Sequence, residues 1–292
     1  MDIRKDGDSM KVGFIGAGKM GFTLGMHFKR HKEFMVTGYY SNNDESAKAA
    51  AQFTDTKYYE DLESLVKDSD AIFLTVPDGQ IAVVADKLDR LDDAIEDKII
   101  CHTSGAVASD VFSGMHSHIY GYSIHPMYAV NSKTESYKNF SDSFITIEGN
   151  EKYLDYFKSA FLNMGHRVKI LAPEHKAAYH CSAVFSSNLV IALFSMAKKL
   201  LLECGFSDEE AEAALMPLFL NNADNMKKGA SKALTGPVAR CDCDTVRKHM
   251  NAILGEKKEV YRFLSKELSY IAEEADEAGV FDYDLLRSVL SD

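Results

Sequence analysis

Short apolar runs alternate with amphipathic stretches through the first 170 residues of the chain. The amphipathic stretches predict helices at residues 20–31, 45–53, 62–67 and 153–164. Strands that alternate with helices indicate βαβ units and a parallel sheet, and nearly continuous apolar strands fit a sheet that is covered on both faces. The apolar runs predict strands at residues 12–15, 34–40, 71–76, 98–102, 119–124, 144–147 and 167–170.

From residue 172 onward the pattern is helical almost throughout. Ala172-Pro173 marks a natural boundary, because proline is tolerated in the first turn of a helix. Beyond it we expect helices at about residues 174–203, 207–228, 244–254 and 256–278, a short helix after residue 282, and a non-helical stretch at 229–240. The predicted organisation is a flexible N-terminal segment (residues 1–9), an α/β domain with a doubly wound parallel sheet (10–171) and an all-α domain (172–292).

Composition narrows the class of protein. With 292 residues, 46% hydrophobic and 26% charged, the chain is neither disordered nor an integral membrane protein. Its net charge of −11 offers no attraction for a phosphate backbone, so we expect no nucleic-acid partner. The apolar stretch 183–202 carries serines, an asparagine and two lysines, which favours a buried helix over a membrane span. Five cysteines and a polar N-terminus indicate the cytoplasm.

The segment VGFIGAGKMG, residues 12–21, has the spacing G-x-G-x-x-G. It follows a predicted strand and opens a predicted helix, which is the context that a dinucleotide-binding motif requires. Gly16 would form the tight turn, Gly18 would let a pyrophosphate approach the backbone, and Gly21 would let helix and strand pack closely. The alternative is a glycine-rich turn that binds nothing.

The end of the second predicted strand bears on the choice of dinucleotide. NAD sites usually place an acid there, whereas this chain has Ser41, Asn42 and Asn43 before its first acid, Asp44. These side chains could donate to a 2′-phosphate, although no arginine lies nearby, and NADP is therefore favoured over NAD. The predicted cofactor-binding residues are Gly16, Ala17, Gly18, Lys19, Met20, Gly21, Ser41, Asn42, Asn43, Val76, Pro77, Asp78, Ser104 and Gly105.

Three further motifs stand at predicted strand ends, where open α/β sheets bind ligands. They are Thr75-Val76-Pro77-Asp78, His102-Thr103-Ser104-Gly105-Ala106 and His125-Pro126-Met127. Each has a purely structural alternative, because proline terminates strands and single histidines are often structural.

The order of these motifs, followed by ALTGPVARCD at residues 233–242, resembles a family of bacterial oxidoreductases. That family joins a Rossmann domain to a helical domain long known only as a domain of unknown function, and it is similar in architecture to ketopantoate reductase, pyrroline-5-carboxylate reductase and the 6-phosphogluconate dehydrogenases. The resemblance covers residues 10–290. One departure is Cys241, which stands where the family commonly has glycine.

The resemblance implies that the helical domain meets the substrate and a second subunit. Related enzymes use polar residues of the helix that follows Pro173 to protonate or hold the substrate, and otherwise such residues are satisfied core groups. Arg240 could clamp a carboxylate, or it could pair with Asp242 and pin its loop. The catalytic candidates are His180, Asn188, Lys176 and His125, and the substrate-binding candidates are Ser104, Arg240, Asp242 and Lys232.

The resulting hypothesis is an NADPH-dependent reductase of a small acidic substrate. Ketopantoate or another 2-oxo acid comes first, and a cyclic imine such as pyrroline-5-carboxylate second. His180 is the expected proton donor, with Lys176 or His125 as alternatives, and we expect no metal because Cys241-Asp242-Cys243 matches no usual zinc spacing. The rival is a non-catalytic NADP-binding sensor. The apolar helix 183–202 needs cover on most sides, which predicts a homodimer through the helical domain.

Overall fold

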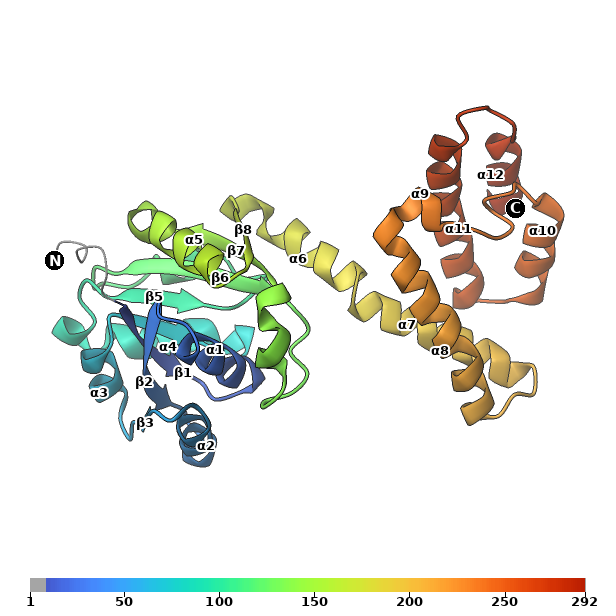
Figure 1. Cartoon of the computed structure of the whole chain (residues 1–292). Helices are drawn as coiled ribbons and strands as arrows, with labels where there is room; N and C mark the ends of the chain where they lie inside the picture. Colours follow the sequence, from blue (N-terminus) through green and yellow to red (C-terminus); the bar gives the residue numbers. More distant parts are fainter. Residues whose placement is uncertain (1–8, 292) are drawn as a thin grey trace. The chain divides into compact units, whose positions relative to one another are not determined.

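The computed structural model describes residues 9–291, which form two compact units that meet between Ser187 and Asn188 in the sequence (Figure 1). The predicted flexible segment, residues 1–9, lies outside the described residues except for Ser9.

In the first unit an eight-stranded sheet has the order β3-β2-β1-β4-β5-β6-β7-β8. All neighbouring strands from β3 to β6 are parallel, which confirms the doubly wound α/β sheet. One pair of neighbours departs from the parallel arrangement, because β7 runs antiparallel to β6. The chain between these strands forms a short 3-10 helix, η3 (Ser136–Asp142), and not the α-helix that usually makes a parallel crossover. The strands are β1 (Met10–Ile15), β2 (Phe34–Tyr40), β3 (Lys57–Tyr58), β4 (Ala71–Leu74), β5 (Ile99–His102), β6 (Tyr120–Met127), β7 (Phe144–Gly149) and β8 (Arg167–Ile170).

Both faces of this sheet are covered, and strand β4 shows how. Its residues Ala71 and Phe73 enter one hydrophobic core with α1, α2 and α5, while Ile72 and Leu74 enter a second core with α3 and α4. Helix α4, which the sequence analysis did not predict, therefore closes one face beside the end of β4. The helices of this unit are α1 (Lys19–Lys29), α2 (Asp44–Thr54), α3 (Leu62–Asp68), α4 (Asp78–Asp89), α5 (Leu154–Asn163) and α6 (Lys176–Phe185).

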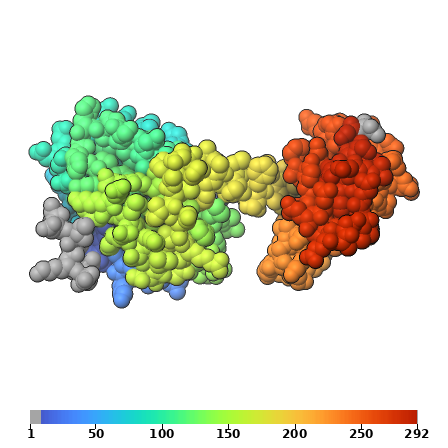
Figure 2. All heavy atoms as spheres, turned by 90° about the horizontal axis from the view of Figure 1, so that it is seen from above, coloured from blue at the N-terminus to red at the C-terminus, as the bar shows by residue number. Residues whose placement is uncertain are grey.

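The second unit, drawn from yellow to red in Figure 2, is helical as predicted. Its core lies among α10, α11 and α12, around Val246, Leu286 and Leu290. One short helix, α9, falls in the stretch that was expected to be non-helical. The helices are α7 (Asn188–Glu203), α8 (Asp208–Asn225), α9 (Ala230–Ala233), α10 (Cys243–Ala252), α11 (Glu256–Ala275) and α12 (Tyr283–Ser291).

The long helix predicted over residues 174–203 is interrupted at Ser186-Ser187. The Ser186 hydroxyl donates to the carbonyls of Ser182 and Ala183, and that of Ser187 donates to Ala183 O at 2.6 Å. Serine hydroxyls that bond to backbone carbonyls in this way compete with the helix ladder. The unit boundary lies at this break and not at residues 171/172, because polar side chains of α6 fasten it to the sheet.

One helical stretch among the described residues, Pro173–Glu203, is long and apolar enough to cross a membrane when judged by length and composition alone. A single stretch of this kind does not by itself make a membrane protein.

A pair of buried histidines joins α1 to the turn before β8. The Nε2 atoms of His27 and His166 lie 2.8 Å apart, so the two rings share one proton in their hydrogen bond. Burial, reinforced by His166 and His31, lowers the pKa of His27 to about 3. Burial also lowers the pKa of His166. Both rings are therefore neutral in the folded protein at neutral pH.

This pair predicts a loss of stability in mild acid. Below pH 6.5 the unfolded chain protonates His27 and the folded chain does not, so stability is complete above that pH and falls as pH drops towards 3. Between pH 7 and 5 we expect His27 to account for about 2 kcal/mol. Urea unfolding should show that His27→Gln loses less stability than the wild type between pH 7 and 5. Some loss should remain, because the pKa values of His102 and His125 are also lowered. His175→Gln, at an exposed position, should leave the loss in place. An unchanged loss in His27→Gln would contradict this account.

Candidate functional site

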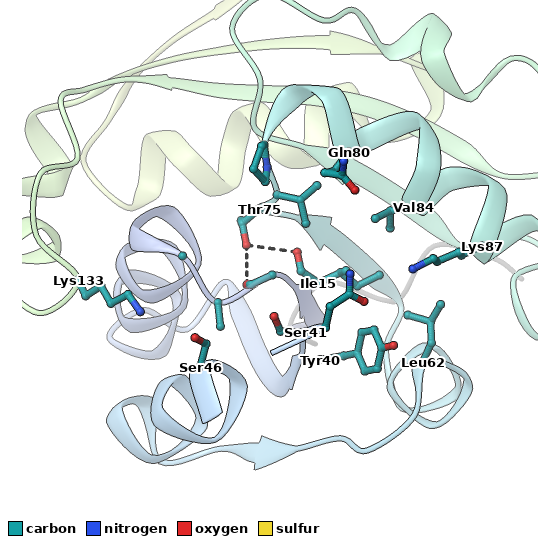
Figure 3. Close-up of a pocket in the computed structure, with 16 residues that line it drawn as sticks. Ile15, Tyr40, Ser41, Ser46, Leu62, Thr75, Gln80, Val84, Lys87 and Lys133 are labelled. Atoms are coloured by element: carbon teal, nitrogen blue, oxygen red, sulfur yellow. Dashed lines mark hydrogen bonds between the residues drawn. The ribbon is translucent and has the colours of Figure 1, made fainter. Parts of the chain in front are cut away.

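A pocket of about 340 Å³ opens at the carboxyl ends of β1, β2 and β4 (Figure 3). This edge includes the point between β1 and β4 where the strand order reverses, which is the ligand-binding position of doubly wound sheets. Half of the predicted cofactor residues line the pocket, namely Gly16, Ala17, Gly18, Ser41, Asn42, Val76 and Pro77. The other lining residues were not predicted, and they are Ile15, Tyr40, Ser46, Leu62, Thr75, Gln80, Val84, Lys87 and Lys133.

The three glycines of the loop are glycines for different reasons. Gly16 has φ +102°, and a Cβ there would lie 2.8 Å from Thr75 O. A Cβ on Gly21 would meet Gly16 O at 2.5 Å. By contrast, Gly18 has φ −80°, and a Cβ there would find its nearest atom, Thr75 O, only at 4.0 Å. The fold thus requires glycine at residues 16 and 21 and leaves open space beside residue 18.

This open space fits the pyrophosphate of a dinucleotide. It lies directly before α1, whose first amides have no partner within the helix and favour an anion. The loop is also held firmly, because Thr75 Oγ1 donates to Gly16 O at 2.8 Å and so joins the ends of β1 and β4 (Figure 3). The cradle is therefore formed in advance of binding.

The remaining predicted cofactor residues do not line the pocket. Asn43 is not among the lining residues, and its Oδ1 accepts the amide of Ser46 at 2.9 Å and caps α2. The cap orients the side chain at the start of α2, but it does not use the Nδ2 group with which an asparagine donates to a phosphate. Lys19, Met20 and Gly21 form the first turn of α1, Asp78 begins α4, and Ser104 and Gly105 belong to a second cluster.

The second cluster begins with the loop after β5, which wraps around the buried ring of His102. The amide of Ser104 donates to His102 Nδ1 at 3.3 Å, so Nε2 carries the proton and donates to Ala108 O at 3.2 Å. Burial lowers the pKa of His102 to about 4. His102 is therefore neutral and shapes the loop.

Ser104 is buried and also holds this loop. Its Oγ accepts the amides of Ala106 and Val107 at 3.1 and 3.0 Å, so the hydroxyl predicted to bind substrate or cofactor orders its own loop and retains its proton as a donor. Its carbonyl oxygen accepts two further bonds, from Ser123 Oγ at 3.2 Å and from Lys176 Nζ at 2.9 Å. The second bond fastens α6 to the loop.

Lys176 is a buried cation, and within the described part of the chain Ser104 O is its one hydrogen-bond partner. Burial lowers its pKa to about 8, while the charges of Glu148 and Asp78 act in the opposite direction. Glu148 is itself buried, and its carboxylate accepts the amide and the hydroxyl of Ser109, both at 2.7 Å. Lys176 is thus still mostly protonated at pH 7 and close to its titration point.

Two histidines complete the cluster on either side of Gly105. His125 Nδ1 and the Tyr179 hydroxyl lie 2.8 Å apart, and desolvation lowers the pKa of His125 to about 3. His180 Nδ1 is buried without a hydrogen-bond partner in the described part of the chain. A Cβ on Gly105 would lie 2.4 Å from His180 Nδ1 and 2.8 Å from His125 Nε2. The fold therefore brings together Ser104, Gly105, His125, Lys176 and His180.

Other predicted site residues belong to the second unit. Asp242 has a structural role there, because it caps α10 by accepting the amide and the hydroxyl of Thr245 at 3.0 and 2.7 Å. Cys241 adopts the left-handed conformation, with φ +51°, at the position where the family has glycine. Asn188, Lys232 and Arg240 are exposed on this unit.

Comparison with known proteins accounts for most of the chain. Residues 2–126 match the Rossmann-like domain, and residues 143–268 match a domain of unknown function, DUF2520. The chain is a Rossmann-like domain joined to a DUF2520 domain. The DUF2520 match begins in the sheet, just before β7, and runs on into the helical unit. No curated protein matches the sequence.

Solved structures share this fold over nearly their whole length. Protein TM1727 of Thermotoga maritima is 25% identical, with a TM-score of 0.71 over 90% of this chain and 98% of that one. A proposed NADP oxidoreductase from Bacteroides fragilis is 21% identical, with a TM-score of 0.69 over 90% and 99%. The pyrroline carboxylate reductase of Plasmodium falciparum, solved with NADP bound, is 14% identical, with a TM-score of 0.53 over 97% and 98%.

The glycine loop gives a paired prediction. Gly18→Val should lower NADPH affinity at least about 100-fold, because its side chain fills the phosphate space. Its melting temperature should stay near that of the wild type. Gly21→Val should instead destabilise the fold, because its Cβ collides with Gly16 O. Fluorescence titration and thermal unfolding of both variants test this, and unchanged NADPH affinity in Gly18→Val would place the nucleotide elsewhere.

Proposed function

We propose that this protein is an NAD(P)-dependent oxidoreductase that reduces a C=O or C=N carbon of a small acid. One observation carries the proposal. The glycine loop, with open space beside Gly18, and the buried polar cluster around Lys176 lie along the same edge of one sheet. The fold shared with a reductase that was solved with NADP supports this pairing.

The residues of the glycine loop and those of the cluster around Lys176 have different proposed roles. The bound dinucleotide supplies a hydride from its nicotinamide ring. The amides that begin α1 hold the pyrophosphate, and Thr75 keeps their loop in place. Gly105, which has no side chain, leaves the His125 and His180 nitrogens close to the loop after β5.

Lys176 is the proposed proton donor, in place of His180. Its ammonium has three N–H groups, of which one donates to Ser104 O, and its pKa of about 8 suits donation near neutral pH. His125 is neutral and bonded to Tyr179, which makes it a poor acid. His180 keeps a supporting role, because its unpartnered Nδ1 is a hydrogen-bonding group that a bound substrate can satisfy.

The proposed substrate is a small 2-oxo acid such as ketopantoate, with a cyclic imine acid such as pyrroline-5-carboxylate as the second choice. Arg240 and Lys232 remain proposed ligands for its carboxylate. A non-catalytic sensor is the less favoured function, because burying a lysine is costly and binding a nucleotide does not require it. We expect the enzyme to act in the cytoplasm.

Turnover should depend on Lys176. NADPH oxidation measured against a panel of 2-oxo acids and cyclic imines should identify a substrate, and Lys176→Met should lower kcat at least about 100-fold without changing NADPH affinity. The wild-type rate should fall as pH rises through about 8, where Lys176 loses its proton, and Lys176→Met should lack this fall.

The matched control is Lys169→Met, the same change at an exposed lysine of β8, which should behave as the wild type. Turnover within twofold of wild type in Lys176→Met would move the donor role to His180. NADPH binding without turnover of any acid would favour the sensor.

We further propose that the helical unit pairs with a second copy of the chain. Among the described residues none of α7 is buried, and Ile191 on this helix is 70% exposed. Leu218 on α8 is 65% exposed. Helices α7, α8, α9 and α11 also enclose a largely apolar hollow of about 610 Å³. Apolar surface of this extent marks an interaction site in a protein that functions in water.

Sedimentation should therefore give twice the chain mass of 32.5 kDa at micromolar concentration. Ile191→Glu should shift the protein to monomer, because it places a charge in the proposed interface. Leu162→Glu, at a 48% exposed leucine of α5, is the matched control and should remain dimeric. A stable wild-type monomer, or flotation with lipid vesicles through the Pro173–Glu203 stretch, would contradict the proposal.

A further inference from the structure

We infer that Lys133 binds the phosphate on the adenosine ribose of NADP and makes the pocket selective for that dinucleotide. The inference rests on the proposed function, since it concerns the same pocket. Sequence analysis found no arginine near Ser41 to neutralise such a phosphate. The fold supplies a lysine from the distant loop between β6 and η3.

The charges of the pocket lining favour a ligand with additional negative charge. The described residues that line it include two lysines, Lys87 and Lys133, and no aspartate or glutamate. This is unusual in a chain of net charge −11. Glu45, near the end of β2, pairs instead with Lys48 at 3.7 Å. No carboxylate in the lining therefore repels a 2′-phosphate.

The position of Lys133 distinguishes it from Lys87. Figure 3 shows Lys133 at one end of the pocket, with its amine towards Ser46, and Lys87 at the other end beside Leu62. Ser41 lies at the end of β2, where this fold binds the adenosine ribose. A phosphate on that ribose would thus have the hydroxyls of Ser41 and Ser46 and the Lys133 ammonium as its neighbours.

Lys133 is also held in this position before any ligand binds. Its ammonium lies 5.0 Å from the ring centre of Phe22, a buried residue of α1, in a cation–π contact. The backbone around it is shaped by Ser132, whose hydroxyl accepts the amides of Thr134 and Glu135 at 3.3 and 3.2 Å. A lysine ordered in this way loses less conformational entropy on binding than a free surface lysine.

The pyrophosphate does not need this lysine. The amides that begin α1 already provide for it, and they serve NAD and NADP equally. A cation at the Ser46 end of the pocket would act on the extra phosphate, so its removal should change the ratio of the two affinities.

Calorimetric titration with NADPH and NADH tests the inference without any need for turnover. Lys133→Ala should weaken NADPH about 10- to 100-fold, the range for one charge-assisted hydrogen bond, and leave NADH within threefold. Adenosine 2′,5′-bisphosphate should weaken in the same way and ADP should not. Lys133→Arg should retain the preference. Lys87→Ala, the same change at the opposite end, should leave the ratio unaltered.

Several results would overturn the inference. NADPH and NADH could weaken together in Lys133→Ala, which would mean that the lysine contacts the pyrophosphate. Lys87→Ala could abolish the preference, or wild type could bind NADH at least as tightly as NADPH. Each of these leaves the oxidoreductase proposal standing. Failure of the wild type to bind either nucleotide would overturn both.

Discussion

A single buried hydrogen bond, from the Lys176 ammonium to the carbonyl oxygen of Ser104, connects the parts of the candidate active site. It fastens α6 to the loop after β5, and thereby sets His180 and Tyr179 over Gly105 and beside His125. A cation in such a place is stable only with compensation, which Glu148 and Asp78 provide through their charges. Glu148 in turn accepts hydrogen bonds from Ser109, the first residue of the short 3-10 helix η2 (Ser109–Phe112). These groups of the candidate active site all belong to a single unit.

Sequence pattern predicted the features whose cause is local. The apolar strands, the glycine loop after β1 and the polar residues at strand ends follow from periodicity and spacing, and the structure places most of them as expected. Lys176 and His180 could be found because the family resemblance directs attention to polar residues of the helix that follows Pro173. Tyr179 carried the same signal and was overlooked. Helix α4 could also have been predicted, because the apolar residues Ile81, Val84 and Leu88 recur at helical spacing.

What could not be predicted depends on contacts between distant segments or on competition for a hydrogen bond. Lys133 reaches the pocket only because its loop packs against α1, and nothing near it in the sequence indicates this. The Oδ1 of Asn43 accepts a backbone amide and caps α2, and Asn43 is not among the residues that line the pocket. Asp242 was diverted in the same way by α10. The interruption at Ser186-Ser187 accompanies hydrogen bonds from the two hydroxyls to backbone carbonyls, and the sequence does not show whether a serine bonds to backbone or to water.

The antiparallel pairing of β6 with β7 has a consequence for how the chain can be divided. The DUF2520 match begins at residue 143, between these two strands, so the boundary of the sequence module cuts through a continuous sheet. A fragment that starts there would carry β7 without β6, one of its two hydrogen-bonding neighbours, and it would remove Glu148 from the loop that it anchors. The preceding fragment would end with β6 paired only to β5, and its open edge would be a template for aggregation. The two sequence modules therefore cannot be exchanged or expressed separately as folding units. The division after Ser187 leaves the sheet intact and keeps α6 attached to it.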